Sequence, residues 1–158
     1  MSTRSGIGYD SHRLAAGRRL VLGGVELESE LGLDGHSDAD ALSHALIDAL
    51  LGAAGLGDIG EHFPDSDERY RDADSLGLLE RAIELVRERG FTLVNVDATI
   101  VMERPKLGPA RALIRERLAG VLGLALADVN VKASTGEGIG FVGRGEGVAV
   151  LAIATLER

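Results

Sequence analysis

Glycine divides this chain into short segments, and the apolar residues within each segment repeat with a clear period. The 158 residues include 22 Gly, about twice the usual frequency of ~7%. Strands are predicted over 5–10, 91–102, 128–134 and 148–155, with a hairpin over 19–28 that turns at Gly23-Gly24. Helices are predicted from an N-cap at Ser37 to about Ala54, from Asp74 or Ser75 to Gly90, and from Pro109 to Gly123. Asp38 and Asp40 would then lie in the first turn of the first helix.

This order of elements predicts a single domain over 1–158 of the α+β (α/β layer) class. We expect a mixed β-sheet with helices packed on one face. One domain usually spans roughly 100–200 residues, which fits this length. Because aromatic residues make up only 3% of the chain, the core must consist of Leu, Ala, Val and Ile.

The composition excludes several classes of function. With no Cys, disulfides, thiolate metal sites and Cys nucleophiles are excluded. The formal net charge of −8 argues against a nucleic-acid partner. No apolar run approaches the ~18 residues of a membrane span, and the first residues lack the apolar core of a signal peptide. We therefore expect no membrane partner and a cytoplasmic location.

Charge is unevenly distributed along the sequence. Residues 34–68 contain nine acidic residues and three of the four His, but neither Lys nor Arg. Such a stretch, without cations of its own, would suit a bound metal ion. The alternative is a solvated acidic face, which composition by itself favours.

The spacing of three residues narrows the metal hypothesis. Asp10 and His12 would point to the same face of a strand, and His44 lies on the first predicted helix. Three such N/O ligands with an open fourth position form the pattern of a catalytic zinc site. Asp40 and Asp48 lie four residues before and four residues after His44 on the same helix face, and either would accept a hydrogen bond from an imidazole N–H. The alternatives are a polar strand end and a solvated helix face.

Three further segments are suited to phosphate. His36-Ser37 precedes a helix N-terminus, where free N–H groups favour anions. Arg104-Pro105-Lys106 forms a cationic corner between a strand and a helix. The segment 134–137 combines hydroxyls, exposed N–H groups and a carboxylate, which together could hold a phosphate with a hard cation. Plain surface charge or a turn would explain each segment alone, but together they indicate phosphoryl chemistry around a metal.

Five motifs, in this order, resemble those of the 2-C-methyl-D-erythritol 2,4-cyclodiphosphate synthase family. They are GIGYDSHRL (6–14), LGGVEL (22–27), HSDADALSHALIDALLGAAGLGDIGEHFPDSD (36–67), NVDATIVMERPKL (95–107) and VNVKASTGEGIGFVGRGEG (129–147). The resemblance covers essentially the whole chain. It implies a phosphorus–oxygen lyase of the non-mevalonate isoprenoid pathway, with a small-molecule substrate. It also implies a homotrimer whose sheets face the three-fold axis and whose sites lie between subunits.

The resemblance also implies roles for individual residues. Asp10, His12 and His44 would bind Zn²⁺, and Glu137 would hold Mg²⁺ or Mn²⁺ together with the substrate diphosphate. His36 and Thr135 would stabilise the transition state. Substrate contacts near the zinc would come from Asp10, Ser11, His12, His36, Ser37, Asp58, Ile59, Gly60, Phe63, Pro64, Asp65, Ser66 and Asp67. The cytidine pocket would comprise Met102, Glu103, Arg104, Pro105, Lys106, Leu107, Gly108, Ser134 and Thr135. Gly136 and Glu137 would also contact the substrate. Phe141 and Arg144 would line a cavity on the trimer axis, where an isoprenoid diphosphate can bind.

The implied reaction is an intramolecular cyclisation. The 2-phosphate of 4-diphosphocytidyl-2-C-methyl-D-erythritol 2-phosphate would attack the β-phosphorus and release CMP. Two positions depart from the family pattern, because Gly136 replaces a usual Thr and Met102 a usual smaller Ala. Two other functions are compatible with the same residues. They are a metal-dependent phosphohydrolase and a non-catalytic module that binds a nucleotide or an isoprenoid diphosphate.

Overall fold

A five-stranded mixed sheet organises the molecule, and the computed structural model describes all residues from 1 to 158. The strands lie in the order β4-β1-β7-β5-β6. Their bounds are β1 Thr3–Ala16, β4 Leu31–Asp34, β5 Thr92–Val101, β6 Val129–Ser134 and β7 Gly147–Glu157. Only β5 and β6 pair in parallel, while the other neighbours are antiparallel. The predicted mixed sheet is confirmed.

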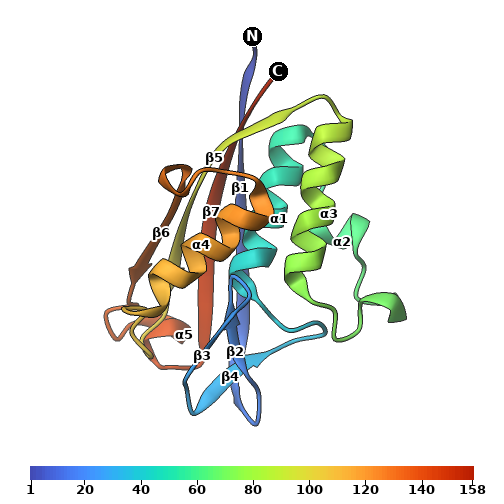
Figure 1. The fold of residues 1–158 in the computed structure, drawn as a ribbon. Helices are drawn as coiled ribbons and strands as arrows, with labels where there is room; N and C mark the ends of the chain where they lie inside the picture. Colours follow the sequence, from blue (N-terminus) through green and yellow to red (C-terminus); the bar gives the residue numbers. More distant parts are fainter.

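The helices cover one face of this sheet, as predicted (Figure 1). The long helices are α1 Ala41–Ala54, α3 Ser75–Glu88 and α4 Ala110–Leu122. Shorter elements are α2 Ile59–His62, α5 Gly140–Gly143 and 3₁₀ turns at Glu68–Tyr70 and Leu126–Asp128. The predicted hairpin is present as β2 Leu20–Leu22 and β3 Val25–Leu27. Its turn residues, Gly23 and Gly24, have positive φ of 59° and 73°, which glycine adopts without steric cost.

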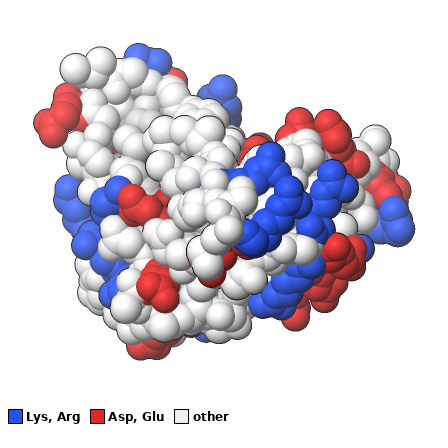
Figure 2. Space-filling view, turned by 90° about the horizontal axis from the view of Figure 1, so that it is seen from above, with Lys and Arg blue, Asp and Glu red and all other residues white.

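The two central strands also carry the ends of the chain. β1 and β7 pair from Thr3↔Glu157 to Arg13↔Gly147, and the termini lie side by side (Figure 1). Seen from above, the largest group of Lys and Arg lies right of centre, and further basic and acidic side chains are scattered over this end (Figure 2). No helix of the structure is both long and apolar enough to cross a membrane.

Helix α1 lies directly on β1 because two glycines of the strand face it. A Cβ atom at Gly6 or Gly8 would overlap the backbone of Ala49 or Ala45. Side chains two residues apart on a strand share a face, so Asp10 and His12 point to the same side as these glycines. The sequence of β1 thus places two polar side chains beside the start of α1.

The core lies between the sheet and the helices and consists mainly of Leu, Ala, Val and Ile, as expected. The opposite face of the sheet is apolar but exposed. Ile7 and Ile153 are 69% and 48% exposed, and Tyr9 and Leu151 are 53% and 41% exposed. These residues form neighbouring cross-strand pairs, Ile7↔Ile153 and Tyr9↔Leu151.

Several predicted boundaries are wrong. Helix α1 begins at Ala41 with Asp40 as its N-cap, so Ser37 is not the cap, and Asp38 and Asp40 are not in its first turn. The physical reason is that the Asp40 carboxylate accepts hydrogen bonds from three backbone N–H groups, those of Ser43, Gly23 and Gly24. Pro109 is likewise the N-cap of α4 rather than its first residue. β1 extends well beyond the predicted 5–10, and β4 was not predicted.

Candidate active site

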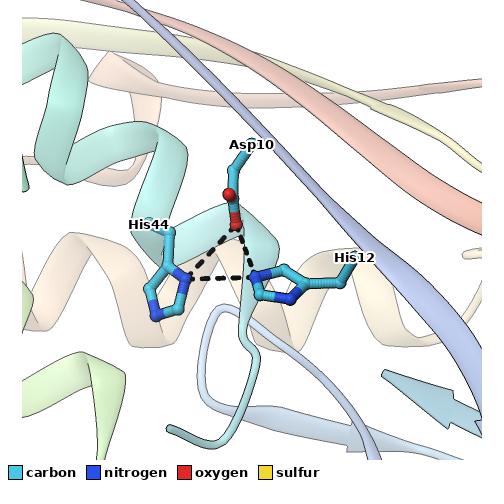
Figure 3. Close-up of side chains that lie close together, drawn as sticks. All are labelled: Asp10, His12 and His44. Carbon is cyan, nitrogen blue, oxygen red and sulfur yellow. Dashed lines mark hydrogen bonds and ion pairs between the residues drawn. The ribbon is translucent and has the colours of Figure 1, made fainter. Parts of the chain in front are cut away.

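Asp10, His12 and His44 converge on one point between β1 and α1 (Figure 3). The Oδ2 atom of Asp10 lies 2.8 Å from Nε2 of His12 and 3.2 Å from Nδ1 of His44. The two imidazole nitrogens are 3.4 Å apart. A tetrahedral zinc ion with bonds of about 2.0–2.1 Å separates its ligands by roughly 3.3 Å. The predicted trio therefore has the spacing of metal ligands.

The remaining nitrogen of each imidazole has its own hydrogen-bond partner. His12 Nδ1 lies 2.9 Å from the carbonyl oxygen of Asp34, which can only accept a hydrogen bond. His44 Nε2 lies 2.8 Å from Oγ of Ser75. When both imidazoles are neutral and carry their protons on these two nitrogens, the nitrogens that face Asp10 offer free lone pairs to a metal ion. The donor set thus fits a divalent metal ion in chemistry as well as in spacing.

The electrostatics of the trio reflect the same contacts. Burial opposes ionisation of Asp10, but hydrogen bonds from His12 and His44 outweigh it and lower the pKa of the carboxyl. Burial also opposes charging of His12, yet the hydrogen bond and charge of Asp10 raise the imidazole pKa. Without a metal ion, a proton on His12 therefore partly takes the place of the cation.

The predicted acceptors for the imidazole N–H groups are wrong. Asp40 is fully buried and is occupied by the β2–β3 turn and Ser43. Asp48 accepts the backbone N–H of Ile59 at 2.8 Å. Burial raises the pKa of both carboxyls. Nor is this stripe of α1 a solvated face, since most of the helix is buried.

Ser75 is the functional residue that sequence reasoning missed. It was considered only as a helix cap, and its hydroxyl instead contacts His44 from the first turn of α3. Its contact with α1 depends on how α3 packs, which has no local sequence signal. Arg18 was also missed. Its guanidinium donates to the carbonyl oxygens of Leu33, Gly35 and Ser37 and so supports the segment that carries His36.

Of the predicted substrate loops, the segment at Ser37 contacts the trio directly. Ser37 is buried, and its Oγ is 3.2 Å from His44 Nε2. The carbonyl oxygen of His36 accepts the N–H of Asp72 at 3.1 Å. Asp58 caps α2, and α2 is tied to α1 through the bond between Ile59 and Asp48. Asp67 is engaged by Arg69.

A second group of predicted residues surrounds a separate cavity of about 230 Å³. Its lining comprises Ile100, Met102, Pro105, Lys106, Leu107, Gly108, Arg111, Ala133, Ser134 and Thr135. Seven of these are predicted from the sequence for the cytidine pocket, and Arg111 is an additional lining residue. Beside the cavity, the carboxylate of Glu103 accepts the backbone N–H of Gly136. Glu137 follows with a positive φ of 54°.

One chain does not bring these two groups together. Asp10 pairs with Val150, Val150 with Ile100, and Ile100 with Ala133. Two strand spacings therefore separate the trio from the nearer strand that lines the cavity, and three separate it from the farther one, which is roughly 10–14 Å between backbones. The predicted residues Phe141 and Arg144 lie near the cavity end of the sheet. Arg144 is paired with Glu146 at 2.8 Å, and Phe141 is 38% exposed.

Comparison with known proteins gives a consistent picture. A 2-C-methyl-D-erythritol 2,4-cyclodiphosphate synthase of Gloeobacter violaceus is 59% identical over 98% of this chain and 94% of its own length. A bifunctional enzyme IspD/IspF of Anaeromyxobacter dehalogenans is 58% identical over 98% of this chain. The chain spans only 40% of that longer relative. A solved 2C-methyl-D-erythritol-2,4-cyclodiphosphate synthase in its CDP-bound form superimposes with a TM-score of 0.91 and 41% identity, covering 98% of this chain and 100% of the other.

The sequence signature of the YgbB family matches residues 3–157. The trio, the fold and these relatives all indicate the same family. The chain belongs to the YgbB family, the family of the 2-C-methyl-D-erythritol 2,4-cyclodiphosphate synthases, and is an enzyme of the non-mevalonate isoprenoid pathway.

Proposed function

We propose that this chain forms its cyclodiphosphate by using a zinc ion at Asp10, His12 and His44, and that each site joins two subunits. The observation that carries this proposal is the separation of the two groups on one sheet. The trio and the cavity lie two to three strand spacings apart, too far for one phosphoryl group to contact both. A neighbouring copy that places its cavity against the trio would complete the site.

The exposed apolar face of the sheet supports this assembly. Ile7, Tyr9, Leu151 and Ile153 form a continuous patch across β1 and β7. A large exposed apolar patch on a sheet is typical of a subunit interface. We infer a homotrimer in which these faces meet around the three-fold axis, with Phe141 and Arg144 of each copy near that axis. A second cavity, on the three-fold axis and lined by Phe141 and Arg144, would accept an isoprenoid diphosphate.

The chain contributes binding and orientation rather than a nucleophile. The substrate is 4-diphosphocytidyl-2-C-methyl-D-erythritol 2-phosphate. The loops at 58–60 and 63–67 would hold its erythritol portion, and the cavity lined by Met102 and Lys106 would hold the cytosine base. When bound, Zn²⁺ at the trio and Mg²⁺ or Mn²⁺ at Glu137 polarise phosphoryl oxygens and neutralise developing charge.

The reaction needs one bond to form and one to break. An oxygen of the 2-phosphate attacks the β-phosphorus, and the bond from that phosphorus to the CMP oxygen breaks, with its electron pair leaving on CMP. His36 and Thr135 would donate hydrogen bonds to the oxygens that gain charge. Because the substrate carries both reacting groups, holding them in line is the main task of the protein.

Product analysis tests this proposal. We expect mass spectrometry of a reaction with Zn²⁺ and Mg²⁺ to find CMP and the cyclic diphosphate in equal amounts. A metal-dependent phosphohydrolase would instead give a linear product heavier by the mass of one water. Binding without any product would indicate a non-catalytic module. The cytoplasmic location expected from the sequence stays a prediction.

A further inference from the structure

A chain of hydrogen bonds leads from the proposed metal site into the space between α1 and α3. His44 Nε2 lies 2.8 Å from Oγ of Ser75. The hydroxyl of Ser75 in turn donates to Oδ1 of Asp38. The other oxygen of Asp38, Oδ2, accepts the backbone N–H of Ser75 at 3.0 Å. Ser75 is fully buried, so water does not compete for its hydroxyl.

The Asp38 carboxylate sets the direction of these hydrogen bonds. An ionised carboxylate can only accept hydrogen bonds, so the Ser75 proton must point to Asp38. The Ser75 oxygen is then left as an acceptor, and His44 must donate to it from Nε2. In a neutral imidazole the other nitrogen, Nδ1, then carries the lone pair. Nδ1 is the atom of His44 that faces Asp10 and His12 (Figure 3).

Asp38 and Ser75 also hold two segments of the site together. The N–H of Asp38 donates to the carbonyl oxygen of Ala73 at 3.3 Å, and the N–H of Asp72 donates to the carbonyl oxygen of His36 at 3.1 Å. The segment before α1 is thus joined to the segment before α3 by backbone bonds on either side of the Asp38 carboxylate. These bonds therefore fix the position of Ser75 Oγ, and its bond to Asp38 makes that oxygen an acceptor for His44.

We propose that Asp38 and Ser75 are positioning residues that select the Nε2–H tautomer of His44 and thereby set the affinity of the trio for its metal ion. This inference rests on the proposed function, because it takes the trio as a metal site. Loss of an outer partner of a metal-binding His typically weakens metal binding by about 10–100-fold. Ser37 Oγ, at 3.2 Å from the same nitrogen, remains when Ser75 is replaced, so we expect the lower half of that range.

Two substitutions test the two members of the chain. Ser75→Ala removes the acceptor of His44. Asp38→Asn keeps the shape but brings an NH₂ group into the pair. With its oxygen toward the Ser75 N–H, this amide would lose the hydrogen bond that Oδ1 accepts from the Asp40 N–H at 3.2 Å. It would donate to the Ser75 hydroxyl and turn the Ser75 proton toward His44. The Nδ1–H tautomer that this favours cannot bind a metal through Nδ1.

A matched control comes from a similar pair at the same helix end. The Ser43 hydroxyl donates to Oδ2 of Asp40 at 2.8 Å, and both residues are fully buried. Neither Ser43 nor Asp40 hydrogen-bonds an imidazole. Ser43→Ala therefore removes a buried Ser–Asp hydrogen bond without changing the partners of His44. It should lower stability as Ser75→Ala does but leave metal affinity unchanged.

The experiment is a competition for Zn²⁺ between a coloured chelator and the full-length protein, with the Co²⁺ absorption spectrum as a second readout. Urea unfolding of the metal-free proteins verifies that each variant is folded. We expect roughly 10-fold or greater weakening for Ser75→Ala and Asp38→Asn, with an altered Co²⁺ spectrum. Wild-type affinity in both folded variants would overturn the inference, as would equal weakening in Ser43→Ala.

The variant His44→Ala distinguishes the positioning role of Asp38 and Ser75 from the proposed metal site itself. If His44→Ala loses the metal while Ser75→Ala and Asp38→Asn retain wild-type affinity, the metal site stands and the positioning role fails. If the wild-type protein and His44→Ala bind Zn²⁺ equally, the metal site is wrong and the positioning role falls with it. If Ser75→Ala does not fold, Asp38→Asn decides the matter by the same measurement.

Discussion

Gly8 on β1 lies directly against the backbone of Ala45 on α1, with no room for a Cβ atom between them. This contact sets the distance between strand and helix. Asp10 follows Gly8 by two residues on the same face of the strand, and His44 precedes Ala45 on the helix. The spacing of the metal trio therefore depends on a residue that takes no part in binding.

Gly8→Ala should consequently damage both stability and metal binding. The added methyl group must push α1 away from β1, and overpacking of this kind costs typically 1–3 kcal/mol, occasionally more. Gly120→Ala, in α4, is the matched control, because a Cβ there has no neighbour within 4 Å. That change should stabilise the protein by about 0.5–1 kcal/mol. Urea unfolding and zinc content measure the two effects, and an unchanged zinc content in Gly8→Ala would contradict the account.

The metal-free protein should have a characteristic dependence on pH. The lowered pKa of Asp10 stabilises the fold above its usual 3.8, and this contribution is lost as the pH falls through the lowered pKa. The raised pKa of His12 stabilises the fold below its usual 6.5, and this contribution is lost as the pH rises through the raised pKa. Both contributions are therefore fully present together only between pH 3.8 and pH 6.5.

Metal binding reverses the second effect, since a metal ion needs neutral His12. Unfolding by urea at about pH 5 and about pH 8, with and without Zn²⁺, should show the metal-free protein weakening toward the higher pH and the zinc-loaded protein gaining. His12→Gln should remove the decline of the metal-free protein. A decline that persists in His12→Gln would assign the titration to another group.

Gly136 differs from the Thr that the family resemblance implies at this position, and the structure gives this difference a consequence. A Cβ atom at this position would lie 2.7 Å from the Gly143 nitrogen and 3.0 Å from Oε1 of Glu103. Gly136→Ala should thus displace the loop that carries Thr135 and Glu137. We expect a several-fold higher KM for the diphosphocytidyl substrate and an unchanged zinc content. Glu103→Gln, which keeps an oxygen acceptor, should have a smaller effect, and an unchanged KM in Gly136→Ala would show that the loop tolerates the methyl.

The assembly proposed above depends on the exposed apolar patch. Ile153→Glu places a charge in the middle of it and should convert the trimer to monomers. Leu113→Glu is the control, because Leu113 is 44% exposed on α4, away from the patch. Light scattering coupled to size-exclusion chromatography measures the mass directly. Monomeric wild-type protein, or a trimer that survives Ile153→Glu, would contradict the proposed interface.

Much of the fold follows from local sequence signals. The β-branched run of β5, the glycine turn between β2 and β3, and the apolar stripes of α1 and α3 each have a clear period. The end of α1 at Gly55, with a positive φ of 70°, also follows from the residue type. The sequence predicts Ser37 as the N-cap of α1, whereas the cap is Asp40. The difference arises because Asp40 is held by the β2–β3 hairpin, which lies far from it in the sequence.

In the site, too, some features follow from local sequence and others depend on tertiary contacts. Asp10 and His12 are linked by strand periodicity, so their shared face could be predicted. The acceptor of His44 could not, because Asp40 and Asp48 have suitable helical spacing but are bound to backbone groups of other segments. Ser75 reaches His44 only through the packing of α3 on α1. Tertiary contacts of this kind leave no pattern in a single sequence.

We expect one metal ion at Asp10, His12 and His44 to be required for turnover. The most direct test removes all metal with a chelator, restores Mg²⁺, and then adds Zn²⁺ in steps while CMP release and bound zinc are measured together. We expect activity to rise in proportion to bound zinc and to level off at one ion per chain, and we expect His44→Ala neither to bind zinc nor to turn over. Full activity in zinc-free protein, or in His44→Ala, would contradict this expectation.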